Sequence, residues 1–503
     1  MDRNLNDIVG VVYFPSGEAE ETVQLKPKDK QNKSDTLFLY FSVITADILI
    51  FVKGCSIVWT SPVIPQLMSN NSDVNPLNEP ITTAEISLLA GLTALSLVLG
   101  TLLFGKLPDT LGRKNTLLSI SMMILITNLV MVFFGIHVYV YIICRSIQQL
   151  GYGLLLASLP IYVNEITEDH NRAKYGCLTM FFLPLGNLYG YLVGPLTSVK
   201  WFTFLNAAPL IPQMILFHLL VPESPIHTAA KGDRVTTIRT LKKLRGNKSE
   251  EEILQDYVKI QESLKSGSRD SSVGGLKKLF GSRGSRMGVL IGFGVCLSQH
   301  VSGVPVVMSF LAPIFNEANT SLSGNEVGML VGAVKLVFFF ITAAVVGRFG
   351  RRPLVLISCM GTAVSLVFIT VYFYLNATNA PIVQSIRWLP LVSILVYISF
   401  YSLGLGSIPC SLLSELFPSD IRATGSCFVM TIVGVFIIII VSSFPLLSVS
   451  LGVHFCTGMY SAGSFVCFAF MYFLLPETRG KSFLEIQHIL SKISGKHSMT
   501  DVE

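Results

Sequence analysis

The sequence predicts an all-α membrane protein with twelve transmembrane helices in two pseudo-symmetric six-helix bundles. Of the 503 residues, 51% are hydrophobic and only 14% are charged. The mean hydropathy of +0.60 is too high for a soluble protein of this length. Twelve apolar stretches are long enough to cross a bilayer as helices. A set of charged motifs also occurs once in each half of the chain, as in membrane proteins built from duplicated bundles.

The twelve stretches follow one another closely, except for a long polar segment in the middle of the chain. Backbone groups in hydrocarbon must pair internally, and stretches of about 20 apolar residues suit helices rather than a barrel. The predicted spans are residues 37–59, 85–106, 116–136, 138–158, 174–196, 201–221, 287–310, 326–347, 353–375, 388–412, 424–446 and 455–475.

These spans divide the chain into five parts. We expect a cytoplasmic N-terminal tail over 1–36, a six-helix bundle over 37–221, a cytoplasmic central loop over 222–286, a second bundle over 287–475 and a cytoplasmic C-terminal tail over 476–503. Apolar residues at helical spacing predict two short amphipathic helices in the central loop. Ser249 and Glu252 form a capping-box pattern at the start of the second of them. Residues 1–35 are polar, so we expect no cleavable signal peptide.

The distribution of Lys and Arg sets the expected orientation. With the N-terminus inside, the inner loops and tails hold 32 of the 37 basic residues, and the loop over 60–84 holds none. We therefore predict an integral protein, in the plasma membrane, with both termini cytoplasmic. The net charge of +6 then faces the anionic inner leaflet, so it does not indicate a nucleic-acid partner. Three glycosylation sequons fall in predicted outer loops, headed by Asn70, Asn319 and Asn376.

The duplicated motifs lie at the predicted cytoplasmic ends of the spans. They are Gly112-Arg113-Lys114 with Gly350-Arg351-Arg352, Glu165 and Arg172 with Glu415 and Arg422, and Pro222-Glu223-Ser224 with Pro476-Glu477-Thr478. Such charges can form a network that closes an inner gate and breaks when the bundles rock. The alternative is that they only anchor helix ends at the headgroups. The predicted gate comprises Asp109, Arg113, Glu165, Arg172, Glu223, Arg351, Arg352, Glu415, Arg422 and Glu477.

The duplicated motifs resemble the sugar porter branch of the major facilitator superfamily over about residues 37–485. The same resemblance extends to Arg145 in the fourth span, residues 299–303 in the seventh and the segment 414–418. The end of the first span, Trp59-Thr60-Ser61-Pro62, is similar to that of insect facilitated trehalose transporter-like proteins. The resemblance implies a facilitative sugar transporter, for trehalose or a hexose, that works by alternating access.

The substrate positions that the resemblance implies have changed in this chain. The paired glutamines of the seventh span are Gln299 and His300, and a neutral imidazole can still exchange hydrogen bonds with hydroxyls. An Asn or Gln of the eighth span is Lys335, and the tryptophan of the tenth is Cys410, which removes a stacking face for a pyranose. The predicted substrate-binding residues are Gln299, His300, Lys335, Thr60, Arg145 and Phe310.

Charge within the spans bears on coupling and on the substrate. Proton-coupled sugar porters place a carboxylate where Thr60 stands, and a threonine cannot carry a proton, which favours facilitated diffusion. Asp47 is the protonatable group that could overturn this interpretation. With Asp47 as the only offset, Lys53, Lys335 and Arg145 leave two excess positive charges, although lysines can also snorkel or pair with lipid.

Two other functions remain open. The excess charge motivates a carrier for an anionic or other non-sugar metabolite, and a sugar sensor that binds without transport is a third possibility. An enzyme is disfavoured, because the sequence has no phosphate-binding loop and no nucleophile elbow. No metal site and no cofactor are predicted. The expected partners are a small-molecule substrate and the lipid bilayer, around a monomer.

Overall fold

The computed structural model describes residues 35–77, 79–168, 170–267, 275–318, 320, 322–417, 421–477, 485–486 and 489–490. It does not describe the side chains of residues 265–267, 275–277, 347, 410, 414, 422 and 423. The described residues form helices and connections, without a β-strand among them. This confirms the predicted all-α membrane fold.

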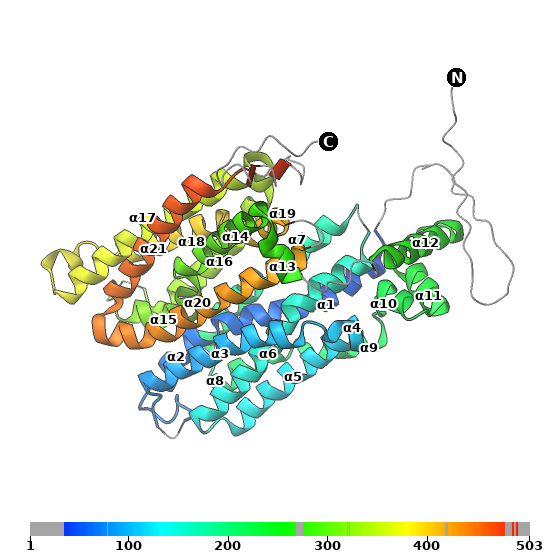
Figure 1. Cartoon of the computed structure of the whole chain (residues 1–503). Helices are drawn as coiled ribbons and strands as arrows, with labels where there is room; N and C mark the ends of the chain where they lie inside the picture. The colour runs from blue at the N-terminus through cyan, green and yellow to red at the C-terminus, as the bar shows by residue number, and fades with distance from the viewer. Residues whose placement is uncertain are drawn as a thin grey trace.

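The helices of the first half form one bundle. They are α1 (Leu37–Val58), α2 (Thr60–Leu67), α3 (Thr83–Phe104), α4 (Leu107–Leu111), α5 (Arg113–Phe134), α6 (Val138–Ile166), α7 (Arg172–Val193), η1 (Gly194–Leu196), α8 (Val199–Ala207) and α9 (Leu210–Leu219). Helix α1 packs mainly on α7, and α6 packs on α3 and α5. Figure 1 shows this bundle along the lower side of the molecule.

The second half forms a matching bundle after the four helices of the central segment. These four are α10 (Pro225–Ala230), α11 (Arg234–Leu244), α12 (Glu250–Gly267) and α13 (Gly275–Gly281). The bundle contains α14 (Arg283–Val301), α15 (Val304–Asn316), α16 (Gly324–Phe349), α17 (Arg351–Ala377), η3 (Pro381–Gln384), α18 (Leu389–Leu403), α19 (Ile408–Leu416), α20 (Arg422–Leu451) and α21 (Val453–Leu474). The two bundles meet where α3 packs on α20, α7 on α16, and α2 on α15.

Eleven helical segments of the described chain are long and apolar enough to cross a membrane. The tenth predicted span, 388–412, is instead broken into α18 and α19. The chain approaches α17 closely at the break, where a Cβ on Gly404 would lie 2.4 Å from the Leu354 carbonyl oxygen. The freed amide of Leu405 donates to Ser358 Oγ at 3.0 Å. A polar side chain of α17 thus satisfies backbone that the break leaves without a helical partner.

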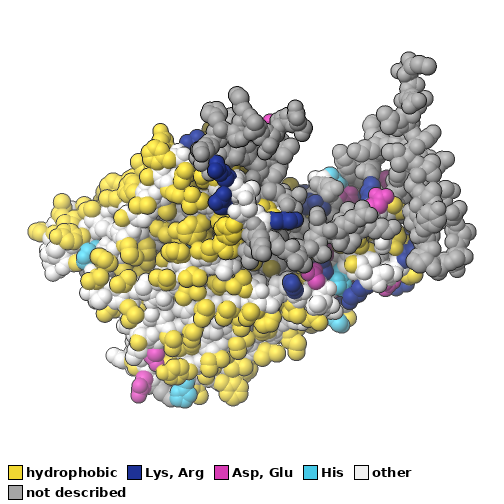
Figure 2. Space-filling model, viewed as in Figure 1, with side chains coloured by type: hydrophobic (Ala, Val, Ile, Leu, Met, Phe, Trp, Pro, Cys, Tyr) yellow, Lys and Arg dark blue, Asp and Glu magenta, His cyan; other side chains and the backbone are white. Residues whose placement is uncertain are grey.

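The flanks of the bundles are apolar. Phe133, Val449 and Phe473 are all more than 70% exposed, a pattern that marks an interaction surface in a water-soluble protein and a lipid-facing surface here. Figure 2 shows hydrophobic side chains over most of the visible flank, with Lys and Arg gathered toward the end that carries α10–α12. The protein is therefore an integral membrane protein.

Corresponding helices of the two halves begin in the same way. Thr82 and Glu85 form a capping box at the start of α3, and Ser323 and Glu326 form one at the start of α16. In each box the hydroxyl accepts from the backbone of the glutamate, whose carboxylate accepts from the backbone of the hydroxyl residue. The duplication therefore extends to the local structure of the helix ends.

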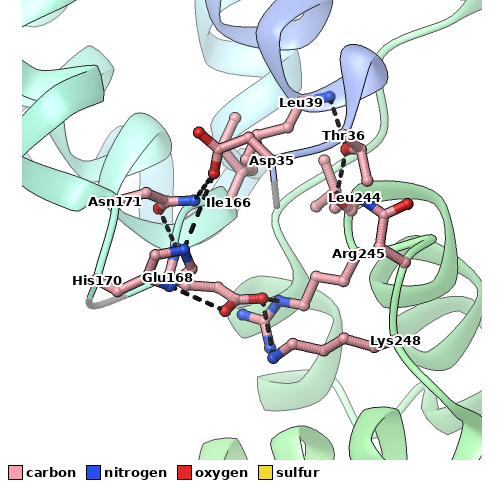
Figure 3. A pocket seen from close by; sticks show the side chains of 11 residues that line it. Asp35, Thr36, Leu39, Ile166, Glu168, His170, Asn171, Leu244, Arg245 and Lys248 are labelled. Carbon is pink, nitrogen blue, oxygen red and sulfur yellow. Dashed lines mark hydrogen bonds and ion pairs between the residues drawn. The ribbon is translucent and has the colours of Figure 1, made fainter. Parts of the chain in front are cut away.

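The central segment contains four described helices where two were predicted, because α10 precedes the expected pair and α13 follows it. The Ser249–Glu252 capping box is confirmed, with Ser249 N donating to Glu252 Oε2 at 2.9 Å. Helices α11 and α12 dock on the first bundle through an ionic cluster (Figure 3). Glu168, between α6 and α7, lies 3.3 Å from Arg245 Nε and 2.9 Å from Lys248 Nζ. Asp256 of α12 pairs with the same two cations at 2.5 and 2.8 Å.

Candidate functional site

The polar groups of the bundles gather at three levels. We call the end that carries Arg113, Glu165, Arg351 and Glu415 the charged end; α10–α12 lie at this end in Figure 1. The end formed by α2, α15 and the turn between α17 and α18 is the opposite end. A third group of polar side chains lies in the middle of the bundles.

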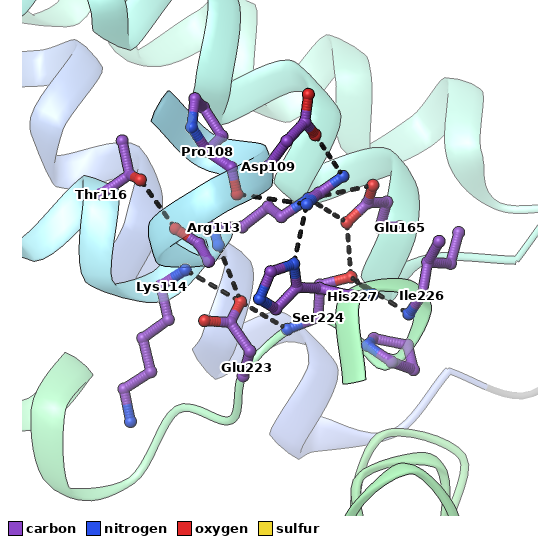
Figure 4. A network of polar contacts seen from close by, with 12 residues as sticks. Pro108, Asp109, Arg113, Lys114, Thr116, Glu165, Glu223, Ser224, Ile226 and His227 are labelled. Carbon is purple, nitrogen blue, oxygen red and sulfur yellow. Dashed lines mark hydrogen bonds and ion pairs between the residues drawn. The ribbon is translucent and has the colours of Figure 1, made fainter. Parts of the chain in front are cut away.

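At the charged end, the first half forms a compact ionic unit (Figure 4). Gly112 has a φ of +98°, a conformation that favours glycine, and α5 begins immediately after it. The Glu223 carboxylate accepts hydrogen bonds from the amides of Arg113 and Lys114 at 2.9 and 3.0 Å. A carboxylate at this place is stabilised by the positive end of the helix dipole. Glu223 therefore serves as the cap of α5.

Arg113 organises the other side chains of this unit. Its guanidinium lies 3.0 Å from Glu165 and 3.0 Å from Asp109. Glu165 in turn accepts a hydrogen bond from Ser224 Oγ. Arg113 Nη1 is 2.9 Å from His227 Nδ1, which must accept because a guanidinium only donates. Burial lowers the pKa of His227, against the opposing effect of Glu223, which favours the neutral ring that this contact requires.

The second half repeats the unit in reduced form. Gly350 has a φ of +85°, and Glu477 accepts from the amides of Arg351 and Arg352 at 3.1 Å each. Arg351 pairs with Glu415 at 2.9 Å. The side chains of this pair are 28% and 25% exposed, against 12% and 11% for Arg113 and Glu165. The second unit is therefore the more solvated of the two.

These contacts assign partners that spacing alone did not. Glu165 pairs with Arg113, whereas Arg172 lies exposed at the start of α7. The side chain of Arg422 lies outside the described residues. Arg113 pairs with Asp109 and Glu165, and Arg351 pairs with Glu415, so each of these ion pairs lies within one half of the chain. The role of these residues as a gate between the bundles stays a prediction.

At the opposite end, hydrogen bonds join the two bundles across a kink in α15. Phe310 has non-helical angles, φ −122° and ψ 21°. In a regular helix the Ala312 amide would donate to the Met308 carbonyl. Here the amide donates to Ser61 Oγ at 2.9 Å, and the carbonyl accepts from the Tyr191 hydroxyl at 2.8 Å. Two side chains of the first bundle thus take up the backbone groups that the kink frees.

Pro313 frees a third backbone group. Proline has no amide hydrogen, so the carbonyl four residues before it, that of Ser309, loses its helical donor. Thr60 Oγ1 donates to this carbonyl at 2.8 Å. Nearby, Gly328 and Gly332 of α16 lie so close to α7 that a Cβ on them would stand 2.8 Å from the Tyr191 ring and 3.1 Å from Leu188 Cα. The bundles are therefore closed against each other at the opposite end.

In the middle of the bundles, three cations lie among neutral partners. Lys335 Nζ donates to Asn187 Oδ1 at 2.8 Å, which links the second bundle to the first. Arg145 donates to Ser56 Oγ at 2.6 Å and stacks on Trp59 at 4.8 Å from the ring centre. Lys53 is only 7% exposed and lies 5.2 Å from the ring centre of Tyr152.

The remaining predicted substrate residues come from the second bundle. Gln299 Nε2 makes a long contact of 3.5 Å with the Gly406 carbonyl, at the break between α18 and α19. His300 Nδ1 is buried without a hydrogen-bond partner among the described residues. Phe310 is buried against Phe444, with 5.2 Å between ring centres. Thr60 is occupied by the interbundle contact described above, and the side chain of Cys410 lies outside the described residues.

Sequence reasoning missed Ser61, Tyr191 and Asn187, each of which makes a hydrogen bond between the bundles. Pro313 was an available signal, because a proline inside a helix leaves a carbonyl that needs another donor. Of the sequon asparagines, Asn70 is exposed at the opposite end, and Asn376 donates to the Glu317 carbonyl at 3.2 Å. Asn319 lies outside the described residues.

Comparisons with known proteins agree on one family. The family model described as "Sugar (and other) transporter" matches residues 25–490. The facilitated trehalose transporter Tret1 of Aedes aegypti is 26% identical over 485 residues, which are 95% of this chain and 59% of that protein. Tret1 of Culex quinquefasciatus is 28% identical over 438 residues, 87% of this chain and 82% of that protein. The chain thus spans little more than half the length of the first of these relatives.

Solved structures with the same fold include those of a bacterial transporter. The inward-open conformation of the xylose transporter XylE from E. coli has a TM-score of 0.72 at 21% identity, covering 90% of this chain and 99% of that one. The proton:xylose symporter XylE bound to 6-bromo-6-deoxy-D-glucose has a TM-score of 0.69 at 22% identity, covering 91% of this chain and all of the other. At these identities the likeness establishes the fold.

Proposed function

The chain belongs to the sugar (and other) transporter family, and on this basis we propose that it is a facilitative transporter of a sugar of the trehalose or hexose class. The observation that carries the proposal is the closure of two duplicated bundles at one end by contacts that can separate. In alternating access, two bundles rock about a central site so that one end opens while the other closes. The hydrogen bonds to residues 308–312 of α15 then form the gate of one state.

We take the charged end as cytoplasmic and the membrane as the plasma membrane. The excess of Lys and Arg at that end supports this orientation, which makes Asn70 extracellular and the closed gate the outer one. The described state is then the one in which the outer gate is closed. The working unit is a single chain in a lipid bilayer, with the ionic units of both halves acting at the inner gate.

Facilitated diffusion is the proposed mode of transport. Thr60 holds the Ser309 carbonyl at the outer gate, and a hydroxyl offers no site for a coupling proton at physiological pH. Gln299 and His300 supply hydrogen-bonding groups for sugar hydroxyls, and Phe310 supplies an apolar face. Trehalose comes first among the substrates because it is in the names of the relatives from Aedes aegypti and Culex quinquefasciatus.

Uptake by cells that display the protein on their surface tests the proposal. We expect saturable uptake of labelled trehalose or glucose that equilibrates without concentrating the sugar and does not change when a proton uncoupler is added. Gln299→Ala should reduce this flux, and Gln384→Ala, the same change in η3 at the opposite end, should not. Flux at the background level with normal surface display would reject the proposal.

A further inference from the structure

Three cations of the membrane core converge on one turn of α1, residues 53–56. Lys53 begins this turn. Arg145 reaches its end from α6, donating to both the hydroxyl and the carbonyl of Ser56, at 2.6 and 2.8 Å. Lys335 reaches it from the second bundle through Asn187, whose Nδ2 donates to the Gly54 carbonyl at 2.9 Å. Helices α1, α6, α7 and α16 therefore place three positive charges around this turn.

Among the described residues, no carboxylate pairs with these three cations. Asp47 is the only acidic residue of the transmembrane helices that lies more than four residues from a helix end. It precedes Lys53 by six residues, about 9 Å along the helix. Its Oδ1 accepts from Thr179 at 2.8 Å, and its Oδ2 has no hydrogen-bond partner among the described residues. Asp47 therefore forms no ion pair with the three cations in the part of the chain that the structure describes.

Lys53 is the least satisfied of the three cations. It is 93% buried, and among the described residues its contact is with the ring of Tyr152 rather than with an oxygen. Arg145, by contrast, has Ser56 and the Trp59 ring, and Lys335 has Asn187. An ammonium in a membrane core is costly without a partner, and such groups mark the paths of ions or substrates. A group with negative charge would supply the partner that Lys53 lacks among the described residues.

We propose that the 53–56 turn of α1, with Lys335 and Arg145, binds one small anionic group, a carboxylate or a halide. The anion would complete the three-cation cluster and lie where the bundles meet, beside the path of the sugar. Its source is either a sugar acid, whose carboxylate it would be, or free chloride that accompanies a neutral sugar. The inference extends the proposed function, because it takes the middle of the bundles as the substrate path.

Anion-dependent stability of the purified full chain tests the site. In a buffer whose only other anion is isethionate, sodium chloride or sodium glucuronate should raise the midpoint of thermal unfolding in a saturable way, because a ligand stabilises the state that binds it. Lys53→Met and Lys335→Met should each need at least about tenfold more anion for the same shift. Lys200→Met, which removes an exposed charge at the start of α8, should behave like the unchanged protein.

Transport assays separate the two sources. Labelled glucuronate that enters cells and competes with trehalose would identify a sugar acid, whereas sugar flux that needs chloride, without glucuronate entry, would identify the halide. Lys53→Arg keeps the charge, so it should keep the anion effect if Lys53→Met fails to fold. Equal response of Lys53→Met, Lys335→Met and the unchanged protein to both salts, or no response in any of them, would overturn the site. Anion binding without trehalose or hexose flux would reject the proposed function and leave the site intact.

Discussion

The Tyr191 hydroxyl is the most sharply testable contact of the outer gate. It is buried and donates to the Met308 carbonyl at 2.8 Å across the two bundles. Tyr191→Phe removes the hydroxyl and keeps the ring that packs on Gly328. We predict that this variant shifts the protein toward the state that is open at the outer end.

The size of the shift follows from the kink in α15. Because the Met308 carbonyl has lost its helical donor, Tyr191→Phe leaves it unsatisfied in a buried place, which costs about 1–3 kcal/mol. The cost falls only on the closed state, since the contact breaks when the bundles part. The ratio of outward-open to outward-closed protein should therefore rise about 5- to 150-fold.

Spin labels at the outer end can measure this ratio. Met68 at the end of α2 and Glu317 at the end of α15 are exposed and belong to different bundles. With cysteines introduced there and the exposed Cys177 and Cys427 replaced by serine, pulsed electron–electron resonance should show a larger population at the longer distance in Tyr191→Phe.

Tyr189→Phe is the matched control for this experiment. Its hydroxyl lies on the same helix, but its contact with the Leu205 carbonyl at 3.4 Å stays within the first bundle. This variant should keep the distance distribution of the unchanged protein. If Tyr191→Phe gives that same distribution, or if Tyr189→Phe shifts as far, the kink does not control the outer gate.

Three further predictions concern stability. Glu165→Gln should lower the free energy of unfolding by about 1–3 kcal/mol. Glu415→Gln should lower it by less than about 1 kcal/mol, because the ion pair of Glu415 is more exposed. Equal losses of stability in thermal unfolding of the two variants would contradict this. Burial opposes ionisation of Asp256, but Arg245 and Lys248 outweigh burial and lower the pKa of this carboxyl. Asp256 therefore keeps its ion pairs from pH 7 to about 4, and the resistance of α11 and α12 to protease should fall only below that pH. Asp256→Asn should weaken this resistance at pH 7 and remove its pH dependence, and an unchanged profile would refute the docking role. Gly186→Ala should lower the midpoint of thermal unfolding strongly, since its Cβ would lie 2.1 Å from a carbonyl oxygen of α1, whereas Gly176→Ala on the same helix meets nothing within 4 Å and should not.

Hydropathy predicted the membrane-spanning helices well because lipid imposes one simple condition on each of them. It did not predict the break between α18 and α19, since residues 388–412 contain no charged side chain. The break depends on the close approach of Gly404 to Leu354 and on the Ser358 hydroxyl that satisfies the freed amide. Both partners are distant in sequence, so no local pattern contains them.

The duplicated motifs were found from the sequence, but their pairing was not. The sequence placed Glu165 in the predicted gate without assigning its partner, and the structure pairs Glu165 with Arg113, 52 residues earlier. Helix packing decides this contact, and a recurring interval of seven residues does not report it. Glu223 illustrates the same limit, because its role as the cap of α5 follows from where α10 docks.

The ionic unit around Arg113 also bears on how the protein is made. All of its members lie between Asp109 and His227, so the unit can close on itself while the ribosome is still synthesising the second half. The bonds to α15 have to wait until residue 312 has entered the membrane. N-terminal domains generally fold first during synthesis. We therefore expect the first bundle to be an assembled template on which the second bundle docks, which places the outer seam among the last contacts of biogenesis.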